Sequence, residues 1–198
     1  MKLGLAMVLA GAVSAAGASQ SFAASTTYTT FYAAGHAAQI CAVAAASAQT
    51  SARATDSEVS ACTTAIRMAG DSNARLAAAY TNRAILHLVR AEYQDSVADS
   101  DSALQIDNQL TEALVNRGVA MLLQRRPNEA EADFTRALSL TGSEQAKIYF
   151  NRAMAREDSG DLRGAYADYS QAAKLAPQWD RPKQELSRFT VVPRTPIS

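Results

Sequence analysis

The sequence has few of the residues on which reactive sites depend. Its 198 residues include two cysteines, two histidines, one tryptophan, five prolines and nine glycines. The cysteines form no Cys-x-x-Cys redox motif. The histidines, His36 and His87, form neither a His-x-x-His nor a His-Glu-x-x-His metal motif, and the scattered glycines make no phosphate-binding loop. We therefore expect no metal and no cofactor.

An excess of charge of one sign is also missing. Nineteen Lys and Arg residues balance nineteen Asp and Glu residues. A nucleic-acid-binding surface requires a basic excess, so nucleic acid is not expected as a partner. The chain also lacks Gly-x-Ser-x-Gly and Ser-x-x-Lys motifs, and no loops flank a carboxylate pair to form a glycosidase cleft. These absences predict a protein that is not an enzyme.

The first 24 residues have the pattern of a secretory signal peptide. Lys2 supplies a positive start, residues 3–17 are uncharged, and residues 21–23 (Ser-Phe-Ala) offer small side chains where a signal peptidase reads. A membrane anchor would need about 20 strongly apolar residues, and no later stretch is long and apolar enough to span a bilayer. We expect cleavage after residue 23 or 24 and export of a mature chain with 18 basic and 19 acidic residues, because Lys2 is removed.

The sequence does contain a 34-residue repeat, which occurs three times, over residues 77–110, 111–144 and 146–179. Each copy has an Asn-Arg pair near its start and an Asp sixteen residues after that Arg, and Gln145 is a one-residue insertion before the third copy. A period of this length indicates helical hairpins that bury their apolar faces by stacking. Abundant alanine and scarce Gly and Pro favour helix throughout, so we expect an all-α chain.

The three copies resemble the tetratricopeptide repeat, in which small residues and an aromatic residue recur at fixed steps along the hairpin. The third copy fits best, with Tyr149, Ala153, Gly160, Ala165, Tyr169, Ala172 and Pro177. The second has Leu114, Gly118, Ala130, Phe134 and Ala137, with Gly142 where Pro is usual. The first departs most, with Ser96 for Ala, Ser100 for the aromatic and Asn108 for Pro. The resemblance implies an α-solenoid of antiparallel helical hairpins with about three full repeats.

The segments on either side are expected to close the ends of this solenoid. Residues 36–70 predict a degenerate N-terminal hairpin, with Asp56 as the N-cap of its second helix. Residues 180–190 predict a capping helix and residues 191–198 an extended tail. Residues 25–35 show no periodic apolar face, which predicts a flexible leader.

The two cysteines lie on the two predicted helices of the N-terminal hairpin. An exported protein meets an oxidising compartment, so we expect a structural disulfide between Cys41 and Cys62. Closing a loop of about 22 residues contributes about 3 kcal/mol in the chain-entropy account.

The recurring Arg and Asp are expected to be structural. Each Arg lies one residue, about 100° of helical turn, from the adjacent Asn, so it points toward the second helix if the Asn faces the concave surface. This predicts the ion pairs Arg83–Asp99, Arg117–Asp133 and Arg152–Asp168, or equivalent pairs between neighbouring repeats. Three identical pairs do not suit one active site, so we assign them to hairpin geometry.

The resemblance also implies a peptide-binding groove along the first helices of the hairpins. The residues of this chain at the groove positions are Thr81, Asn82, Ile85, Glu112, Val115, Asn116, Val119, Lys147, Phe150, Asn151 and Met154. An Asn at one place in every repeat suits a peptide backbone, because its amide both donates and accepts hydrogen bonds. The set is not a carboxylate clamp, because Asn151 stands where such a clamp requires Arg.

These inferences predict a non-catalytic protein–protein interaction module that acts as an adaptor or assembly factor in a Gram-negative periplasm, or after secretion. Its partner is expected to be a protein or peptide. No membrane insertion is expected after signal cleavage, and the mature chain is a monomer or a weak homo-oligomer. Two alternatives remain open, a self-associating structural protein and an accessory subunit of an envelope enzyme.

Overall fold

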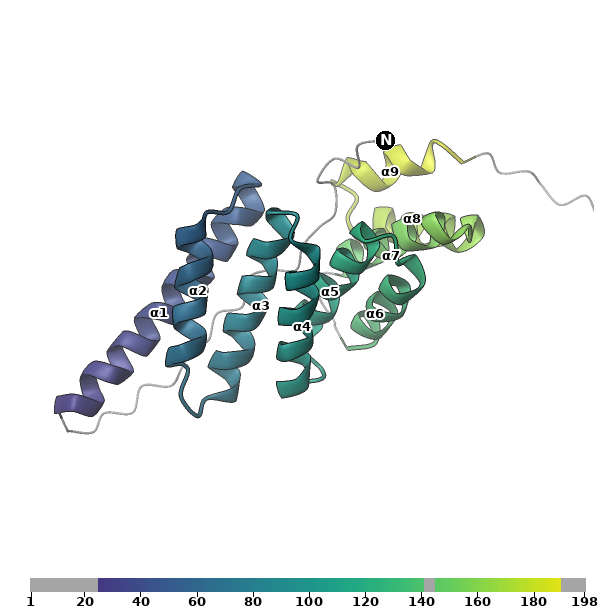
Figure 1. Cartoon of the computed structure of the whole chain (residues 1–198). Helices are drawn as coiled ribbons and strands as arrows, with labels where there is room; N and C mark the ends of the chain where they lie inside the picture. Colours follow the sequence, from purple (N-terminus) through teal and green to yellow (C-terminus); the bar gives the residue numbers. More distant parts are fainter. Residues whose placement is uncertain (1–24, 141–144, 190–198) are drawn as a thin grey trace, which may run out of the picture.

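The computed structural model describes residues 25–140 and 145–189, with side chains from Ala33 onward. Within these residues every regular element is an α-helix, which confirms the predicted all-α fold (Figure 1). The helices are α1 (Ser25–Ser51), α2 (Asp56–Met68), α3 (Asn73–Val89), α4 (Tyr93–Ile106), α5 (Thr111–Leu123), α6 (Pro127–Leu140), α7 (Gln145–Ser159), α8 (Leu162–Leu175) and α9 (Asp180–Leu186). The predicted signal peptide and tail lie outside the described residues.

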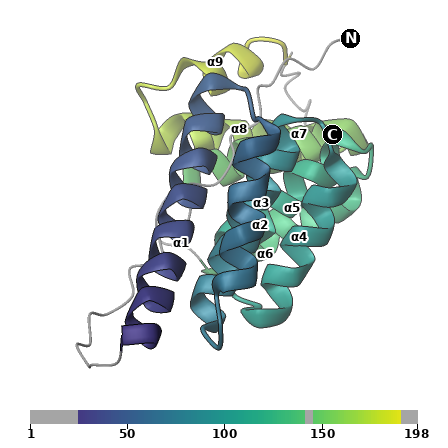
Figure 2. The same cartoon turned by 60° about the vertical axis from the view of Figure 1, so that its left-hand side comes forward.

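Consecutive helices pair into four hairpins, α1–α2, α3–α4, α5–α6 and α7–α8, and each hairpin packs on the next. The first helices also contact one another along the stack, α1 with α3, α3 with α5 and α5 with α7. The first helices therefore form one row and the second helices another (Figures 1 and 2). This is the α-solenoid that the repeat pattern predicted.

The N-terminal hairpin differs from its prediction in two respects. Helix α1 begins at Ser25, so the flexible leader predicted over residues 25–35 is wrong; this segment contains no proline and continues into an alanine-rich stretch of high helix propensity. The N-cap of α2 is Thr55 rather than Asp56, because Thr55 and Glu58 form a capping box. Helix α1 has 27 residues and α2 has 13, so α1 extends well past its partner (Figure 2).

The opposite end of the stack is covered by α9. The ring centroids of Trp179 and Phe150 lie 4.8 Å apart, and Leu186 and Phe189 pack against the buried ring of Tyr169 and its neighbours. Helix α9 ends at Leu186 and is shorter than the capping helix predicted over residues 180–190. Its inner side completes the apolar core of the last repeat.

None of the helices in the described part of the chain combines the length and apolar character that a bilayer crossing requires.

Candidate functional site

The predicted groove residues all lie on the row of first helices. Thr81, Asn82 and Ile85 come from α3, the next four from α5, and Lys147, Phe150, Asn151 and Met154 from α7. Because α3 contacts α5 and α5 contacts α7, the fold brings the three sets onto neighbouring helices. The repeat register therefore positions one Asn per helix along a single row.

Most of these side chains are buried rather than exposed. Eight of the eleven are at most 3% exposed: Thr81, Asn82, Ile85, Val115, Asn116, Val119, Phe150 and Asn151. Glu112, Lys147 and Met154 are half-buried. The sequence prediction of a groove lined by all eleven side chains therefore needs correction.

The correction has a packing reason. Val115 and Val119 belong to the central hydrophobic core, in one cluster with Leu88. Phe150 packs against Trp179 and Tyr169 in the C-terminal core. An apolar side chain on the row of first helices can be buried by neighbouring helices as well as by a ligand. The sequence alone therefore could not distinguish these core residues from ligand contacts.

Asn116 on α5 has a buried side-chain amide without a hydrogen-bond partner. Its side chain is fully buried, yet neither its amide oxygen nor its amide nitrogen has a hydrogen-bond partner. A buried polar group without a partner costs about 1–3 kcal/mol. The centre of the row, on α5, therefore holds an amide that can both donate and accept a hydrogen bond.

In each repeat an Arg of the first helix binds an Asp of the second helix, a contact that we call the arginine joint. The Asp carboxylate of the second helix accepts two hydrogen bonds from the Arg of the first helix, at 2.7 and 2.8 Å for Arg83–Asp99 and at 2.6 and 2.8 Å for Arg117–Asp133. In the third repeat the two distances from Arg152 are 2.8 and 2.9 Å. These are the three intra-repeat pairs predicted from the sixteen-residue spacing.

The same arginines also reach the preceding hairpin, which the sequence analysis did not resolve. The remaining guanidinium nitrogen donates to Thr63 from Arg83 (2.9 Å), to Asp101 from Arg117 (2.6 Å) and to Thr135 from Arg152 (3.2 Å). Each joint therefore ties three helices together. The hydrogen bond with Asp133 is the main cause that raises the pKa of Arg117, while its partial burial acts in the opposite direction.

The disulfide predicted in the N-terminal hairpin is confirmed. Cys41 on α1 and Cys62 on α2 are fully buried and bonded, with their Cα atoms 4.6 Å apart. Cys62 precedes buried Ala65 by three residues, as Phe134 precedes Ala137 in α6. The disulfide therefore takes the place in the first hairpin that an aromatic ring takes in the second repeat.

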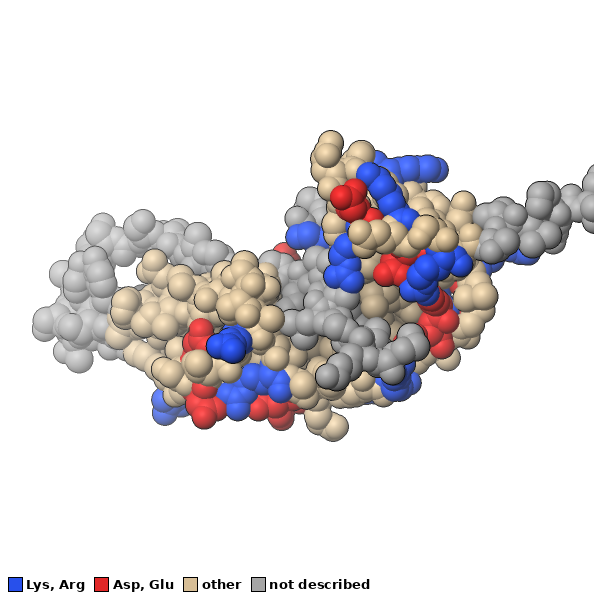
Figure 3. All heavy atoms as spheres, turned by 90° about the horizontal axis from the view of Figure 1, so that it is seen from above, with Lys and Arg blue, Asp and Glu red and all other residues tan. Residues whose placement is uncertain are grey.

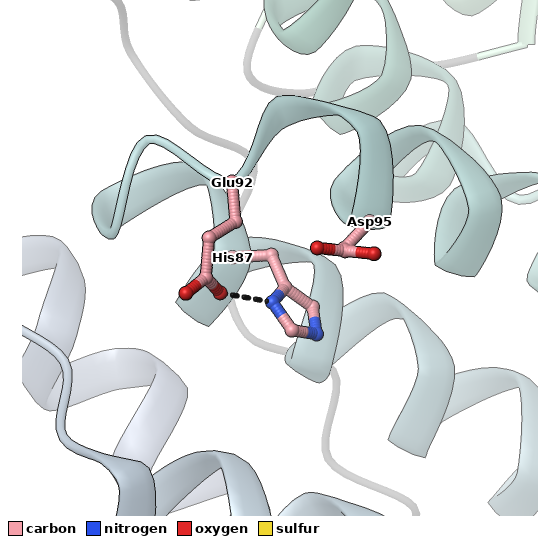
Figure 4. Close-up of side chains that lie close together, drawn as sticks. All are labelled: His87, Glu92 and Asp95. Atoms are coloured by element: carbon pink, nitrogen blue, oxygen red, sulfur yellow. Dashed lines mark hydrogen bonds and ion pairs between the residues drawn. The ribbon is translucent and has the colours of Figure 1, made fainter.

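A side-chain cluster at the α3–α4 turn was not predicted from the sequence, in which His87 belongs to neither of the two histidine motifs considered. Its Nδ1 donates to Glu92 Oε2 at 2.7 Å, and the carboxylate of Asp95 lies nearby (Figure 4). Together they form a grouping whose ligand atoms lie within 4.8 Å of one another, as a metal site would require. The sequence indication of this cluster was the presence of a histidine and two acidic residues within nine positions around the α3–α4 turn.

Hydrogen bonding already occupies much of this cluster. Glu92 uses one oxygen for His87 and the other for Arg90 Nε at 2.8 Å, and His87 Nε2 lies 3.6 Å from Asp99. The hydrogen bond from His87 is the largest cause that lowers the pKa of Glu92, followed by that from Arg90. We therefore assign the cluster to the geometry of the turn rather than to a metal site.

Residues 146–178, which cover α7 and α8, match the family model of the tetratricopeptide repeat. The match identifies the hairpin α7–α8, the third of the three repeated units, as a tetratricopeptide repeat. The match agrees with the in-register residues of that copy and supports protein–protein interaction as the general function, because stacked repeats of this kind form extended binding surfaces. No curated protein matches the chain significantly.

Proposed function

We propose that the protein is an exported, non-catalytic adaptor of the cell envelope that binds an extended segment of a partner protein along α3, α5 and α7. The general role rests on the tetratricopeptide match. The envelope location is supported by the disulfide between Cys41 and Cys62, since such bonds persist in oxidising compartments. The signal-like pattern of the first 24 residues points the same way.

The observation that carries the binding face is the unpartnered amide of Asn116. A peptide backbone that donated to its oxygen and accepted from its nitrogen would satisfy both groups at once. Because the side chain is buried, access for such a ligand requires the surface over α5 to open locally. The half-buried Glu112 and Lys147 on the same row have opposite charges, so the segment is expected to be nearly neutral.

The surface charge is consistent with a neutral ligand. On the face of the molecule that Figure 3 shows, basic and acidic side chains lie interspersed, without a broad field of one sign. Recognition on such a surface depends on backbone hydrogen bonds and apolar contacts rather than on long-range attraction.

The test is affinity capture from native envelope extract with mature chain 25–198, followed by anisotropy with a peptide from the captured protein. Asn116→Leu removes the amide at similar volume, and Asn128→Leu, at an exposed position on α6, is the matched control. We expect Asn116→Leu to weaken binding about tenfold, the effect of about 1.4 kcal/mol, and Asn128→Leu to bind as the parent does.

The stability of the two variants separates binding from folding. Replacing an unsatisfied buried amide by an apolar group of similar shape is close to neutral or stabilising, so Asn116→Leu is expected to melt no lower than the parent chain. Weaker binding with unchanged stability supports the proposed face. Equal binding by both variants would move the interface to another surface, and capture of an enzyme would favour the accessory-subunit alternative. N-terminal sequencing of the envelope form tests the export proposal, with a start at Ala24 or Ser25 expected.

A further inference from the structure

Helix α1 is the outermost helix at the N-terminal end of the stack, and it carries no charged residue over its 27 positions. It packs on α2 and α3 through a buried side that includes Ala37, Cys41, Ala44 and Ala48. The other end of the solenoid is different, because α9 covers it with a short helix that has the sequence DRPKQEL. The N-terminal end of the stack thus lacks a charged cap in the described structure.

The exposed side of α1 has a regular stripe. Ile40 is 44% exposed and Val43 is 62% exposed, which places them among the large apolar side chains that the described chain presents to solvent. The stripe continues at alternating steps of three and four residues through Ala33, His36, Ile40, Val43, Ser47 and Thr50, all of which are exposed. This spacing is the heptad seam of two packed helices, and the stripe extends over about 27 Å at 1.5 Å per residue.

The stripe is self-complementary in the antiparallel orientation. Its midpoint lies between Ile40 and Val43, so a two-fold axis at that point places Ile40 of one copy opposite Val43 of the other. The same axis pairs His36 with Ser47 and Ala33 with Thr50. The two largest apolar side chains then meet at the centre, and small or polar ones lie toward the ends, as in a contact with an apolar core and a polar rim.

Charge also favours a second copy as the occupant. A two-fold interface packs the same surface patch of each copy against the other, so a face with net charge would repel itself. The stripe on α1 has no acidic side chain and no Lys or Arg, and its one titratable residue, His36, lies away from the two-fold axis and pairs with Ser47 rather than with a second histidine. A partner attracted by charge would find nothing on this face to recognise.

We propose that α1 forms a symmetric, antiparallel homodimer through the stripe centred on Ile40 and Val43. Each copy contributes two large apolar side chains, so the contact belongs with small, transient interfaces and has a dissociation constant of about 1–100 μM. The dimer leaves the row α3, α5 and α7 outside the contact. It would therefore present two copies of the proposed partner-binding face.

The first experiment is sedimentation velocity of mature chain 25–198 over a concentration series that spans this range. The parent chain is expected to shift from monomer to dimer. Ile40→Lys with Val43→Lys places four positive charges at the two-fold axis and is expected to weaken the dimer at least tenfold. The matched control is Leu162→Lys with Leu175→Lys, two exposed positions on α8 that are 56% and 45% exposed, and it is expected to dimerise as the parent does.

Cross-linking tests the orientation. Chains carrying Ile40→Cys and Val43→Cys, mixed under mild oxidation, are expected to give mostly the mixed disulfide, because antiparallel pairing places these two positions opposite each other. A parent chain that stays monomeric throughout, or a double Lys variant that dimerises normally, would overturn the proposal. Predominant like-with-like cross-links would overturn the antiparallel arrangement. Binding of monomers to vesicles of phosphatidylethanolamine and phosphatidylglycerol that requires Ile40 and Val43 would show that the stripe serves a membrane surface instead.

Discussion

The first and third repeats have the same arginine joint and different interiors. In α8 the ring of Tyr169 is buried, and its hydroxyl donates to Glu157 at 3.0 Å. In α4 the corresponding position is Ser100, and one turn earlier Ser96 stands where α8 has Ala165. Both serines are fully buried, and neither hydroxyl has a hydrogen-bond partner. The first repeat thus keeps the hairpin geometry without the aromatic residue that fills the later ones.

This difference shows that the geometry of a repeat and its stability depend on different residues. Arg83 and Arg152 make the same bidentate contact with their own second helix and a further contact with the hairpin before it. The joints therefore hold the helices in register whether a ring or a serine lies between them. The aromatic side chain adds buried apolar area, which affects stability more than geometry.

The largest effect is expected when the buried aromatic residue of the second repeat is replaced by serine, the residue that the first repeat has at this position. Phe134 is fully buried, so Phe134→Ser leaves a cavity and a buried hydroxyl and should lower the free energy of unfolding by about 3–5 kcal/mol. Urea denaturation followed by circular dichroism measures the loss. The control is Ala132→Ser, which puts serine at an exposed position of the same helix and should cost about 0.5 kcal/mol. Equal losses would show that the ring does not stabilise the repeat.

The N-terminal hairpin extends the comparison, because it has a covalent bond where the second repeat has a ring. Replacing both Cys41 and Cys62 by Ala should lower stability by about 3 kcal/mol. Thermal unfolding with and without a reducing agent checks this. Reduction should lower the melting temperature of the parent and leave the double variant unchanged. A parent insensitive to complete reduction would show that packing alone holds this hairpin.

The repeat period, the arginine pairs and the disulfide could be predicted from sequence because each depends on spacing along helices. Arg117 and Asp133 are sixteen residues apart in a hairpin, and that separation alone brings them together. The bridges to Thr63, Asp101 and Thr135 depend on how one hairpin sits on the next, which the spacing within a copy does not contain.

The candidate site was less predictable, because burial on the row of first helices is decided by neighbours from other segments. Phe150 was expected in a groove, but Trp179, the final residue of the last repeat, packs against it. The start of α1 was missed for a related reason. Residues 25–35 show no apolar periodicity, although their composition permits helix.

A smaller effect is expected at Gly118 on α5, where the absence of a side chain leaves room for the ring of Phe134. A Cβ atom on Gly118 would lie 2.7 Å from Phe134 Cε1 and 2.9 Å from its Cζ, so Gly118→Ala forces the ring to move and should cost about 1–3 kcal/mol. The first repeat has Ala84 at the same register and the smaller Ser100 at the position of Phe134. In the Phe134→Ser background the Gly118→Ala cost should therefore largely disappear. A double-mutant cycle in urea measures the coupling, and additive losses would contradict the proposed contact.

The smallest expected effect concerns the turn between the two helices of a repeat. The third repeat places Gly160 there with φ of 90°, whereas the first has Ala91 with φ of 61°. A left-handed residue with a Cβ atom is strained, so Ala91→Gly should stabilise the chain by about 0.5 kcal/mol after the greater freedom of glycine in the unfolded state is included.

The same substitution inside a helix should have the opposite sign. Ala98→Gly, at an exposed position of α4, should destabilise by about 1 kcal/mol. The two variants are compared by thermal melting against the parent, and a loss of stability in both would show that Ala91 is not strained. A gain at Ala91 alone would mean that the first repeat differs from the third in its turn as well as in its interior, and that both differences lower its stability without changing its fold.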